Sequence, residues 1–301
     1  MTDTTHTLAV DLGGTNMRVA VVHDDGTIVD REHAPTPHDA PRIDPFIGLL
    51  RGVRDRHRVG HAVIALPGRV DHREGLLLHA PNLPKGWDEQ VTRAALEDAL
   101  QLEVDLANDA DVAAVGEAYY GAGKDHLDVA YVTVSTGVGA GVLVGGKVLL
   151  PRYSGGEIGH TVIESAAAAR GAPAEVEELG SGTALARLAS EAGLDARGAE
   201  LVGLVETGDA RAVDVWERGM HAVGVGIANL VHIVAPTCIV IGGGVGRNGE
   251  LVLAPVRTAL ERYGPIGPTP EVVTAALGDD PGLIGAAAWR RAAGHRARKE
   301  P

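Results

Sequence analysis

Three glycine-rich turns, each directly after a short apolar strand pattern, constrain the fold of this chain more than any other feature. They are DLGGT (Asp11–Thr15), STGVG (Ser135–Gly139) and GGGVG (Gly242–Gly246). A phosphate chain needs backbone N–H donors at close range. Glycine permits that approach, and Thr or Ser adds a hydroxyl donor. One such turn is usually only a turn, but three in this order predict a phosphate-binding protein.

The elements around these turns fall into two successive halves, each mixing strands with helices. Strands interrupted by hairpins and long helices, in this repeated order, indicate a duplicated α/β architecture. The apolar patterns predict strands at residues 61–66, 102–107, 129–134, 140–144 and 238–241, and helices at 44–58, 88–100 (with Asp88 as N-cap), 110–120, 183–192, 213–234 and about 283–295.

Charge and cysteine content limit the partners of the chain. Its net charge of −13 disfavours nucleic acid in bulk, so a phosphate ligand needs a local site made from backbone N–H groups or a metal. The single cysteine, Cys238, excludes an internal disulfide and a multi-cysteine metal site. No apolar run approaches the roughly 20 residues of a membrane-spanning helix, and no signal-peptide pattern is present. We therefore expect a cytoplasmic protein with no membrane or nucleic-acid partner.

Five motifs, in this order, resemble the ROK family of bacterial sugar kinases: DLGGTNMR, NDADVAAVGE, STGVGAG, GGEIGH and IVIGGGVG. The resemblance runs from about Leu8 to about Ala288. It implies the α/β, actin/hexokinase-like ATPase fold, with two α/β domains and with ATP and the sugar meeting in the cleft between them. It also implies closure of the domains on the sugar, and assembly as a homodimer or homotetramer.

On this resemblance we expect a small N-terminal α/β domain over residues 1–108 and a large C-terminal α/β domain over residues 109–282. The C-terminal helix, about 283–301, is expected to pack back on the N-terminal domain.

The resemblance implies a nucleotide bound by the three glycine turns. It implies that Asp11, Gly13, Gly14, Thr15, Asn16, Arg18, Thr136 and Gly137 lie near the phosphates, and that Gly243 and Gly244 lie near the adenosine. Asp11 ends the first strand and is the candidate to hold Mg²⁺ through water, because Mg²⁺ gives up its hydration shell reluctantly. ATP and Mg²⁺ are the expected cofactors.

Asp109 follows a predicted strand and begins a predicted helix, and this position has two interpretations. A helix N-terminus keeps a carboxylate ionised, as a general base must be. Asp is also a common N-cap there. Position alone leaves these alternatives equal. The family's catalytic, sugar-binding Asp falls at this place in the Asn-Asp motif, which favours the base. We interpret Asp111 as a first-turn helix charge that points elsewhere.

GGEIGH supplies Glu157 and His160, which by resemblance hold sugar hydroxyls. A carboxylate suits sugars because it accepts hydrogen bonds from two hydroxyls at once, and leaving such partners unpaired is costly. Asn108, Asn82 and Gly68 are further expected sugar contacts.

The segment after GGEIGH departs from the family pattern. The family carries three cysteines here, which form a structural zinc site with the His. This chain reads TVIESAAAARGAPAEVEELGSGTAL and has no cysteine there. We therefore expect no zinc and a loop held by packing alone. Alignment back from Ser181 places Glu177 at the family's sugar-binding Glu. Glu175 and Glu178 lie close enough to leave that assignment open, and a solvated acidic run is the alternative.

Because this loop differs from the family pattern, the identity of the sugar substrate is not determined by the resemblance. We expect phosphorylation of a hexose-like sugar at its 6-hydroxyl. Glucose is the first candidate, and an amino sugar such as kanosamine or glucosamine is the second, because Asp109, Glu157 and Glu177 would tolerate an ammonium group. A sugar-like cyclitol of antibiotic biosynthesis is the alternative acceptor, and polyphosphate is the alternative donor.

Two non-enzymatic functions compete with the kinase. A ROK-type transcription repressor needs a DNA-binding domain before the kinase-like part, and the first phosphate strand begins at Leu8. A sugar sensor without turnover is disfavoured because Asp109 and all three phosphate turns are present.

Overall fold

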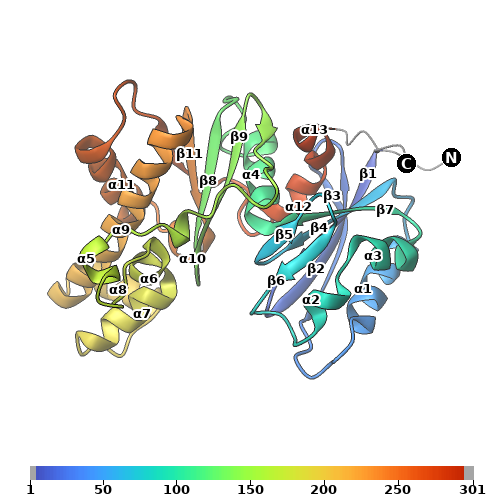
Figure 1. Cartoon of the computed structure of the whole chain (residues 1–301), viewed down its shortest axis with the longest axis horizontal. Helices are drawn as coiled ribbons and strands as arrows, with labels where there is room; N and C mark the ends of the chain where they lie inside the picture. Colours follow the sequence, from blue (N-terminus) through green and yellow to red (C-terminus); the bar gives the residue numbers. More distant parts are fainter. Residues whose placement is uncertain (1–4, 295–301) are drawn as a thin grey trace. The chain divides into compact units, whose positions relative to one another are not determined.

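The computed structural model describes residues 5–294, which form two compact units (Figure 1). Among the described residues, unit 1 consists of residues 5–127, 141–155 and 277–294, and unit 2 consists of residues 128–140 and 156–276. The chain therefore crosses from one unit to the other several times.

Unit 1 is built on a five-stranded sheet with strand order β3-β2-β1-β4-β7. A meander of three antiparallel strands comes first, as the Asp25-Gly26 turn predicts, and β4 and β7 then add parallel to β1. The strands are β1 (His6–Leu12), β2 (Asn16–His23), β3 (Ile28–Pro35), β4 (His61–Leu66) and β7 (Glu103–Asn108).

Helices cover both faces of this sheet (Figure 1). On one face, Leu8, Val10 and Leu12 alternate along β1 and join a core with Phe46 and Leu50 of the adjoining helix. The helices of that face are α1 (Asp44–Arg54) and α3 (Arg93–Leu100), and those of the other are α4 (Asp109–Tyr120) and α12 (Pro281–Ala286). The short β5 (Arg69–Asp71), β6 (Leu76–His79), β10 (Lys147–Val148) and α13 (Trp289–Ala293) complete unit 1.

The prediction of a single helix at residues 88–100 is wrong. The segment divides into α2 (Trp87–Gln90) and α3, and Gly86 rather than Asp88 precedes the first of them. The side chain of Thr92 accepts a hydrogen bond from the backbone N–H of Ala95 at 3.2 Å and begins α3. Thr92 also forms a β-bridge with Leu76, which holds the chain extended between the two helices.

Unit 2 contains the parallel strands β8 (Val129–Val134), β11 (Cys238–Gly242) and β12 (Glu271–Thr274). They belong to a sheet with strand order β10-β9-β8-β11-β12, in which β9 (Val138–Val144) begins in unit 2 and continues into unit 1. The long helix α9 (Ala210–Val234) buries Trp216, Met220, Val223 and Ile227 at helical spacing. Other helices of unit 2 are the 3₁₀ helix η1 (Ile158–His160), α5 (Ser165–Ala168), α6 (Val176–Gly180), α7 (Gly182–Glu191), α8 (Ala199–Glu206), α10 (Gly243–Gly246) and α11 (Glu250–Tyr263).

The compact units do not coincide with the boundaries expected after residues 108 and 282. Helix α4 lies in unit 1 because it packs against α12 and β7 of that unit. Residues 283–294 also belong to unit 1, whereas the end of the expected C-terminal helix, 295–301, lies outside the described residues. Within residues 5–294, no helix combines the length and hydrophobicity that a membrane span requires.

Candidate active site

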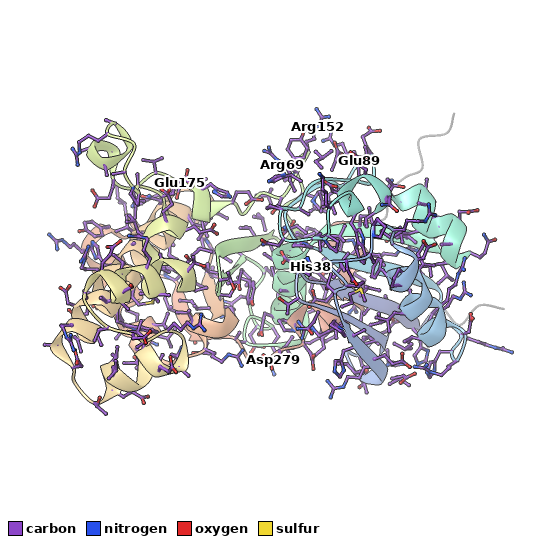
Figure 2. The ribbon with its side chains drawn as sticks, turned by 90° about the horizontal axis from the view of Figure 1, so that it is seen from below. His38, Arg69, Glu89, Arg152, Glu175 and Asp279 are labelled. Atoms are coloured by element: carbon purple, nitrogen blue, oxygen red, sulfur yellow. The ribbon has the colours of Figure 1, made fainter. Side chains whose placement is uncertain are left out.

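The first glycine turn joins β1 to β2 in unit 1, and its backbone is held by side chains from outside the motif. Thr36 donates its hydroxyl to the Gly13 carbonyl at 2.7 Å, and His38 (labelled in Figure 2) donates Nε2–H to the Gly14 carbonyl at 2.6 Å. A Cβ on Gly14 would lie 2.6 Å from the carbonyl oxygen of Asn82, so the turn packs directly on the Asn82 loop. Thr36 and His38 belong to no motif, and sequence reasoning missed both.

Asp11 and Arg18 face each other across the β1–β2 pair and form an ion pair. Arg18 also donates to the Asp279 carbonyl at 2.5 Å and lies 3.7 Å from the Asp280 carboxylate. The guanidinium is therefore held beside the turn by oxygens of unit 1. The Asp11 carboxylate, at the end of β1 beside this turn, is compatible with a hydrated Mg²⁺, which proteins bind through one or two carboxylates plus substrate phosphates.

Asp109 lies at the start of α4, where Asn108 holds the N-cap position. The Asn108 side chain accepts from the backbone N–H of Ala110 at 3.0 Å and donates to the Gly68 carbonyl at 3.0 Å. Asn108 and Ala110 are buried, whereas Asp109 between them is exposed. The alternative that Asp109 serves as the N-cap is therefore wrong. Its carboxylate accepts from the N–H of Ala110 at 2.8 Å, and the positive end of the helix favours its negative charge.

Asp111 lies in the first turn of α4, as interpreted from the sequence, and it differs from Asp109 in its burial. Its side chain is fully buried, and one carboxylate oxygen lies 3.7 Å from Nε2 of the buried His72. The other ring nitrogen of His72, Nδ1, donates to the Leu106 carbonyl at 3.4 Å. The pair of Asp111 and His72 thus links the first turn of α4 to the segment that follows β5.

In unit 2, the GGEIGH segment places Glu157 at the start of η1 and His160 at its end. His160 donates Nδ1–H to the Glu175 carboxylate at 3.0 Å. This hydrogen bond raises the pKa of His160, burial opposes the rise, and the negative charges of Glu177 and Glu157 add to it. The structure therefore brings the three predicted residues of this segment, Glu157, His160 and Glu177, into one electrostatic cluster.

The expectation that packing alone holds the zinc-free loop is wrong, because hydrogen bonds hold it. The Glu177 carboxylate accepts from the backbone N–H of Val138 at 2.8 Å. Val176 N–H donates to the Thr161 carbonyl at 3.1 Å, and Ile163 N–H donates to the Ala174 carbonyl at 2.9 Å. Among residues 5–294, no group of three or more His, Cys, Asp or Glu side chains is arranged to hold a metal ion.

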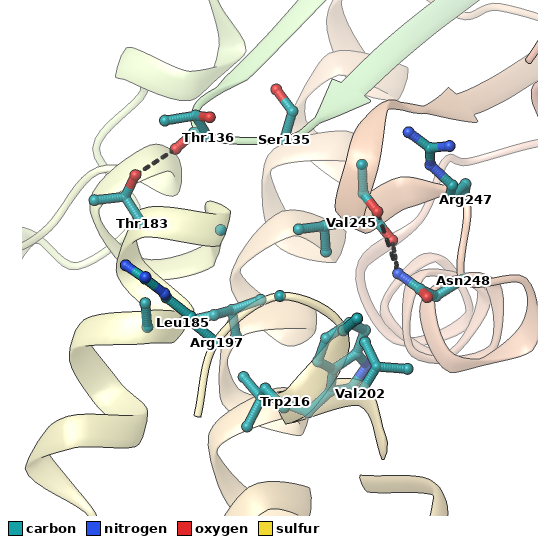
Figure 3. A pocket seen from close by; sticks show the side chains of 16 residues that line it. Ser135, Thr136, Thr183, Leu185, Arg197, Val202, Trp216, Val245, Arg247 and Asn248 are labelled. Carbon is teal, nitrogen blue, oxygen red and sulfur yellow. Dashed lines mark hydrogen bonds between the residues drawn. The ribbon is translucent and has the colours of Figure 1, made fainter. Parts of the chain in front are cut away.

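A cavity of about 830 Å³ opens in unit 2 between the second and third glycine turns (Figure 3). Of the residues predicted to bind the nucleotide, Thr136 and Gly244 line this cavity, and the Thr183 hydroxyl donates to the Thr136 carbonyl at 2.8 Å. Such a volume is typical of small-molecule sites. The lining consists of Ser135, Thr136, Gly182, Thr183, Leu185, Ala186, Arg197, Gly198, Ala199, Leu201, Val202, Trp216, Gly244, Val245, Arg247 and Asn248.

Gly243, which precedes the cavity-lining Gly244, packs closely against the backbone at the end of β8. Its φ is +86°, and a Cβ there would lie 2.5 Å from the carbonyl oxygen of Val134. Only glycine fits this conformation without strain. Arg197, Trp216 and Arg247 also line the cavity, and sequence reasoning missed them because they come from helices and loops without a motif.

The ROK family profile matches residues 7–293, almost the whole described chain. The chain belongs to the ROK family. Over 308 residues this ROK chain is 30% identical to a glucokinase of Streptomyces coelicolor, covering 93% of this chain and 96% of the relative.

Two solved structures extend the likeness to the fold. One is a ROK family glucokinase from Streptomyces griseus in complex with glucose and AMPPNP, with a TM-score of 0.80 and 30% identity over 95% of this chain and 99% of that one. The other is a ROK hexokinase from Thermus thermophilus, with a TM-score of 0.81 and 32% identity over 94% and 96%. The expected family and actin/hexokinase-like fold are confirmed, and the ROK chain is an ATP-dependent sugar kinase.

Proposed function

We propose that this kinase transfers the γ-phosphate of ATP to the 6-hydroxyl of a hexose-like sugar, with Asp109 as general base. The observation that carries the proposal is the exposed Asp109 carboxylate between two buried neighbours, at a helix start that Asn108 already caps. A carboxylate that is not needed as the cap can accept the proton of a substrate hydroxyl.

The other predicted residues align the reactants. In unit 1 we assign Asn108, Gly68 and Asn82 to sugar hydroxyls; this assignment is supported by the hydrogen bond from Asn108 to the Gly68 carbonyl and by the packing of Asn82 on the first glycine turn. In unit 2, Glu157, His160 and Glu177 supply further hydrogen-bonding groups. Phosphoryl transfer depends chiefly on such alignment and on charge neutralisation, since the protein does little covalent chemistry.

The phosphates are assigned to the first two glycine turns and Arg18, and the adenosine to the cavity beside Gly243 and Gly244. Mg²⁺, when bound with ATP, neutralises charge on the phosphates, and Asp11 would hold its water shell. ATP is favoured over polyphosphate because the cavity adds an apolar region around Trp216 and Val202, which a polyphosphate chain does not need.

Glucose is the first candidate acceptor, because the Streptomyces coelicolor relative is a glucokinase. An amino sugar such as kanosamine or glucosamine is the second, because the carboxylates of Glu157, Glu175 and Glu177 converge on one segment and favour a cation. A cyclitol of antibiotic biosynthesis presents similar hydroxyls and stays a third candidate.

A coupled assay of ADP release, run with glucose, mannose, glucosamine, kanosamine and a cyclitol panel, tests the proposal. We expect sugar-dependent ADP release with a 6-phosphorylated product. Binding of a sugar without turnover would instead identify a sensor. Strong preference for glucose over every amino sugar would remove the second candidate, and replacing ATP by polyphosphate in the same assay tests the donor. Assembly as a dimer or tetramer stays a prediction for sedimentation analysis.

A further inference from the structure

The three glutamates at the start of α6 have different partners. Glu178 accepts from the backbone N–H groups of Ala174 at 2.8 Å and Glu175 at 3.1 Å, which lowers its pKa. Glu177 accepts from Val138 N–H, and Glu175 accepts from His160. Glu175 and Glu178 together form the capping box at the start of α6, and Glu177 contacts the second glycine turn. Of the three, Glu175 is the one whose carboxylate is hydrogen-bonded to the ring of His160.

The hydrogen bond to Glu175 determines how the His160 ring is held. A carboxylate can only accept, so Nδ1 of His160 carries the proton in that bond. The remaining nitrogen, Nε2, is then on the opposite side of the ring. The side chain of His160 is 65% exposed, so without this bond its ring could rotate among several orientations. The raised pKa of His160 agrees with Glu175 as its main partner.

The backbone keeps Glu175 in place independently of that bond. Glu175 forms a β-bridge with Val162, Val176 N–H donates to the Thr161 carbonyl, and Ile163 N–H donates to the Ala174 carbonyl. The strand-like pairing therefore fixes the distance from α6 (Figure 2 labels Glu175) to η1 whether or not the Glu175 carboxylate is present. Changing that carboxylate should alter the His160 ring and remove one capping-box hydrogen bond of α6, while this pairing keeps the segment folded.

We propose that Glu175 is a positioning residue for sugar binding: it orients His160 through Nδ1 so that Nε2 meets a sugar oxygen. The inference rests on the proposed function, because it takes His160 to be a sugar contact. It deepens that function by separating the roles of the three glutamates. Glu178 shapes the helix start, Glu175 orients His160, and Glu177 is the carboxylate assigned to the sugar itself.

The experiment compares Glu175→Ala, which removes the acceptor, with Glu175→Gln, whose amide oxygen can still accept from Nδ1–H. The pair is exposed, so its loss should change binding by roughly two- to fivefold. We expect Glu175→Ala to raise the sugar KM by that factor with kcat nearly unchanged, and Glu175→Gln to restore most of the loss. Glu164→Gln, an exposed carboxylate change on the same segment, is the matched control.

A double-mutant cycle with His160→Ala decides whether Glu175 acts through the ring. In the His160→Ala background, Glu175→Ala should have no further effect on KM. ¹⁵N NMR of the His160 ring should show a protonated, hydrogen-bonded Nδ1 that is lost in Glu175→Ala, while the melting temperature changes by no more than about 4 °C.

Three results would overturn the inference: an unchanged KM in Glu175→Ala, an effect of equal size with His160 absent, or no change in the ring signal. If His160→Ala leaves KM unchanged while Asp109→Asn abolishes turnover, the positioning role fails and the proposed kinase mechanism stands. If both variants retain full turnover, the assignment of the catalytic site itself is wrong.

Discussion

The carboxylate of Glu177 accepts a hydrogen bond from the backbone N–H of Val138 at 2.8 Å, which joins α6 to the second glycine turn. A Cβ on Gly137 would lie 2.4 Å from the same carboxylate. One side chain therefore contacts the turn assigned to the phosphates while it belongs to the segment assigned to the sugar.

Substituting Glu177 should separate these two contacts. In Glu177→Gln the amide oxygen can still accept from Val138, so we expect unchanged stability and a sugar KM raised by about tenfold or more, as for loss of a charged hydrogen bond. Glu177→Ala should in addition lower the free energy of unfolding by about 1–3 kcal/mol, because the Val138 N–H loses its partner. Steady-state kinetics and urea denaturation measure both effects. A normal KM in Glu177→Gln would limit Glu177 to a structural role.

Asp109→Asn should lower kcat by about 10³-fold, while sugar binding persists, because an amide cannot take the hydroxyl proton. Calorimetric titration with the sugar and the ADP-release assay test the two parts. Asp209→Asn is the matched control, because Asp209 is a helix N-cap that accepts from Arg211 N–H at 2.9 Å. Near-normal turnover in Asp109→Asn would remove Asp109 from the role of base.

Gly243→Ala should weaken ATP binding and lower the free energy of unfolding by about 1–3 kcal/mol. The new side chain would meet the Val134 carbonyl in a backbone conformation that suits only glycine. Gly244→Ala is the control for stability, since a Cβ there meets nothing within 4 Å. Equal losses of stability in the two variants would contradict this account of the turn.

Asp111→Ala should destabilise the protein by about 3–5 kcal/mol, as removal of one partner of a buried ionisable pair does. The measurement is the free energy of unfolding in urea. Asp125→Ala, at an exposed position of the same unit, should change that free energy by less than about 0.5 kcal/mol. A comparable loss in both variants would mean that the pair with His72 is not what matters.

Metal removal should have little effect on the fold of unit 2. The loop after η1 is held by hydrogen bonds that the carboxylates of Glu175 and Glu177 accept, so we expect substoichiometric zinc by elemental analysis and no fall in melting temperature with a chelator. Stoichiometric zinc in the purified protein would refute this expectation.

Local patterns predicted much of the fold and the motif residues of the candidate site. The strands before the glycine turns, and the corner at Asn108 and Asp109, depend on residues close in sequence, so a single sequence reveals them. Thr136 and Gly244 come from such turns and line the cavity of unit 2, while their contact with a nucleotide stays a prediction.

Features that depend on distant partners could not be predicted in the same way. The break before α3 requires the bridge from Thr92 to Leu76, and the burial of Asp111 requires His72 from a separate loop. The partner of His160 is Glu175, in a stretch without strand or helix periodicity. Arg197 and Trp216 reach the cavity from segments whose sequence gives no functional signal.

The division of unit 1 into three stretches has a consequence for how the protein is made. Helix α12, which packs on α4 and β1, begins at Pro281, so unit 1 lacks part of its covering until more than 280 residues have been synthesised. In unit 2, β8 pairs with β11, and β11 begins 109 residues after Val129 (238 minus 129), so this pair forms only after a long stretch of chain has been synthesised. Each core therefore needs segments that are synthesised long after its first strands, and apolar strands exposed over that interval favour aggregation of the nascent chain.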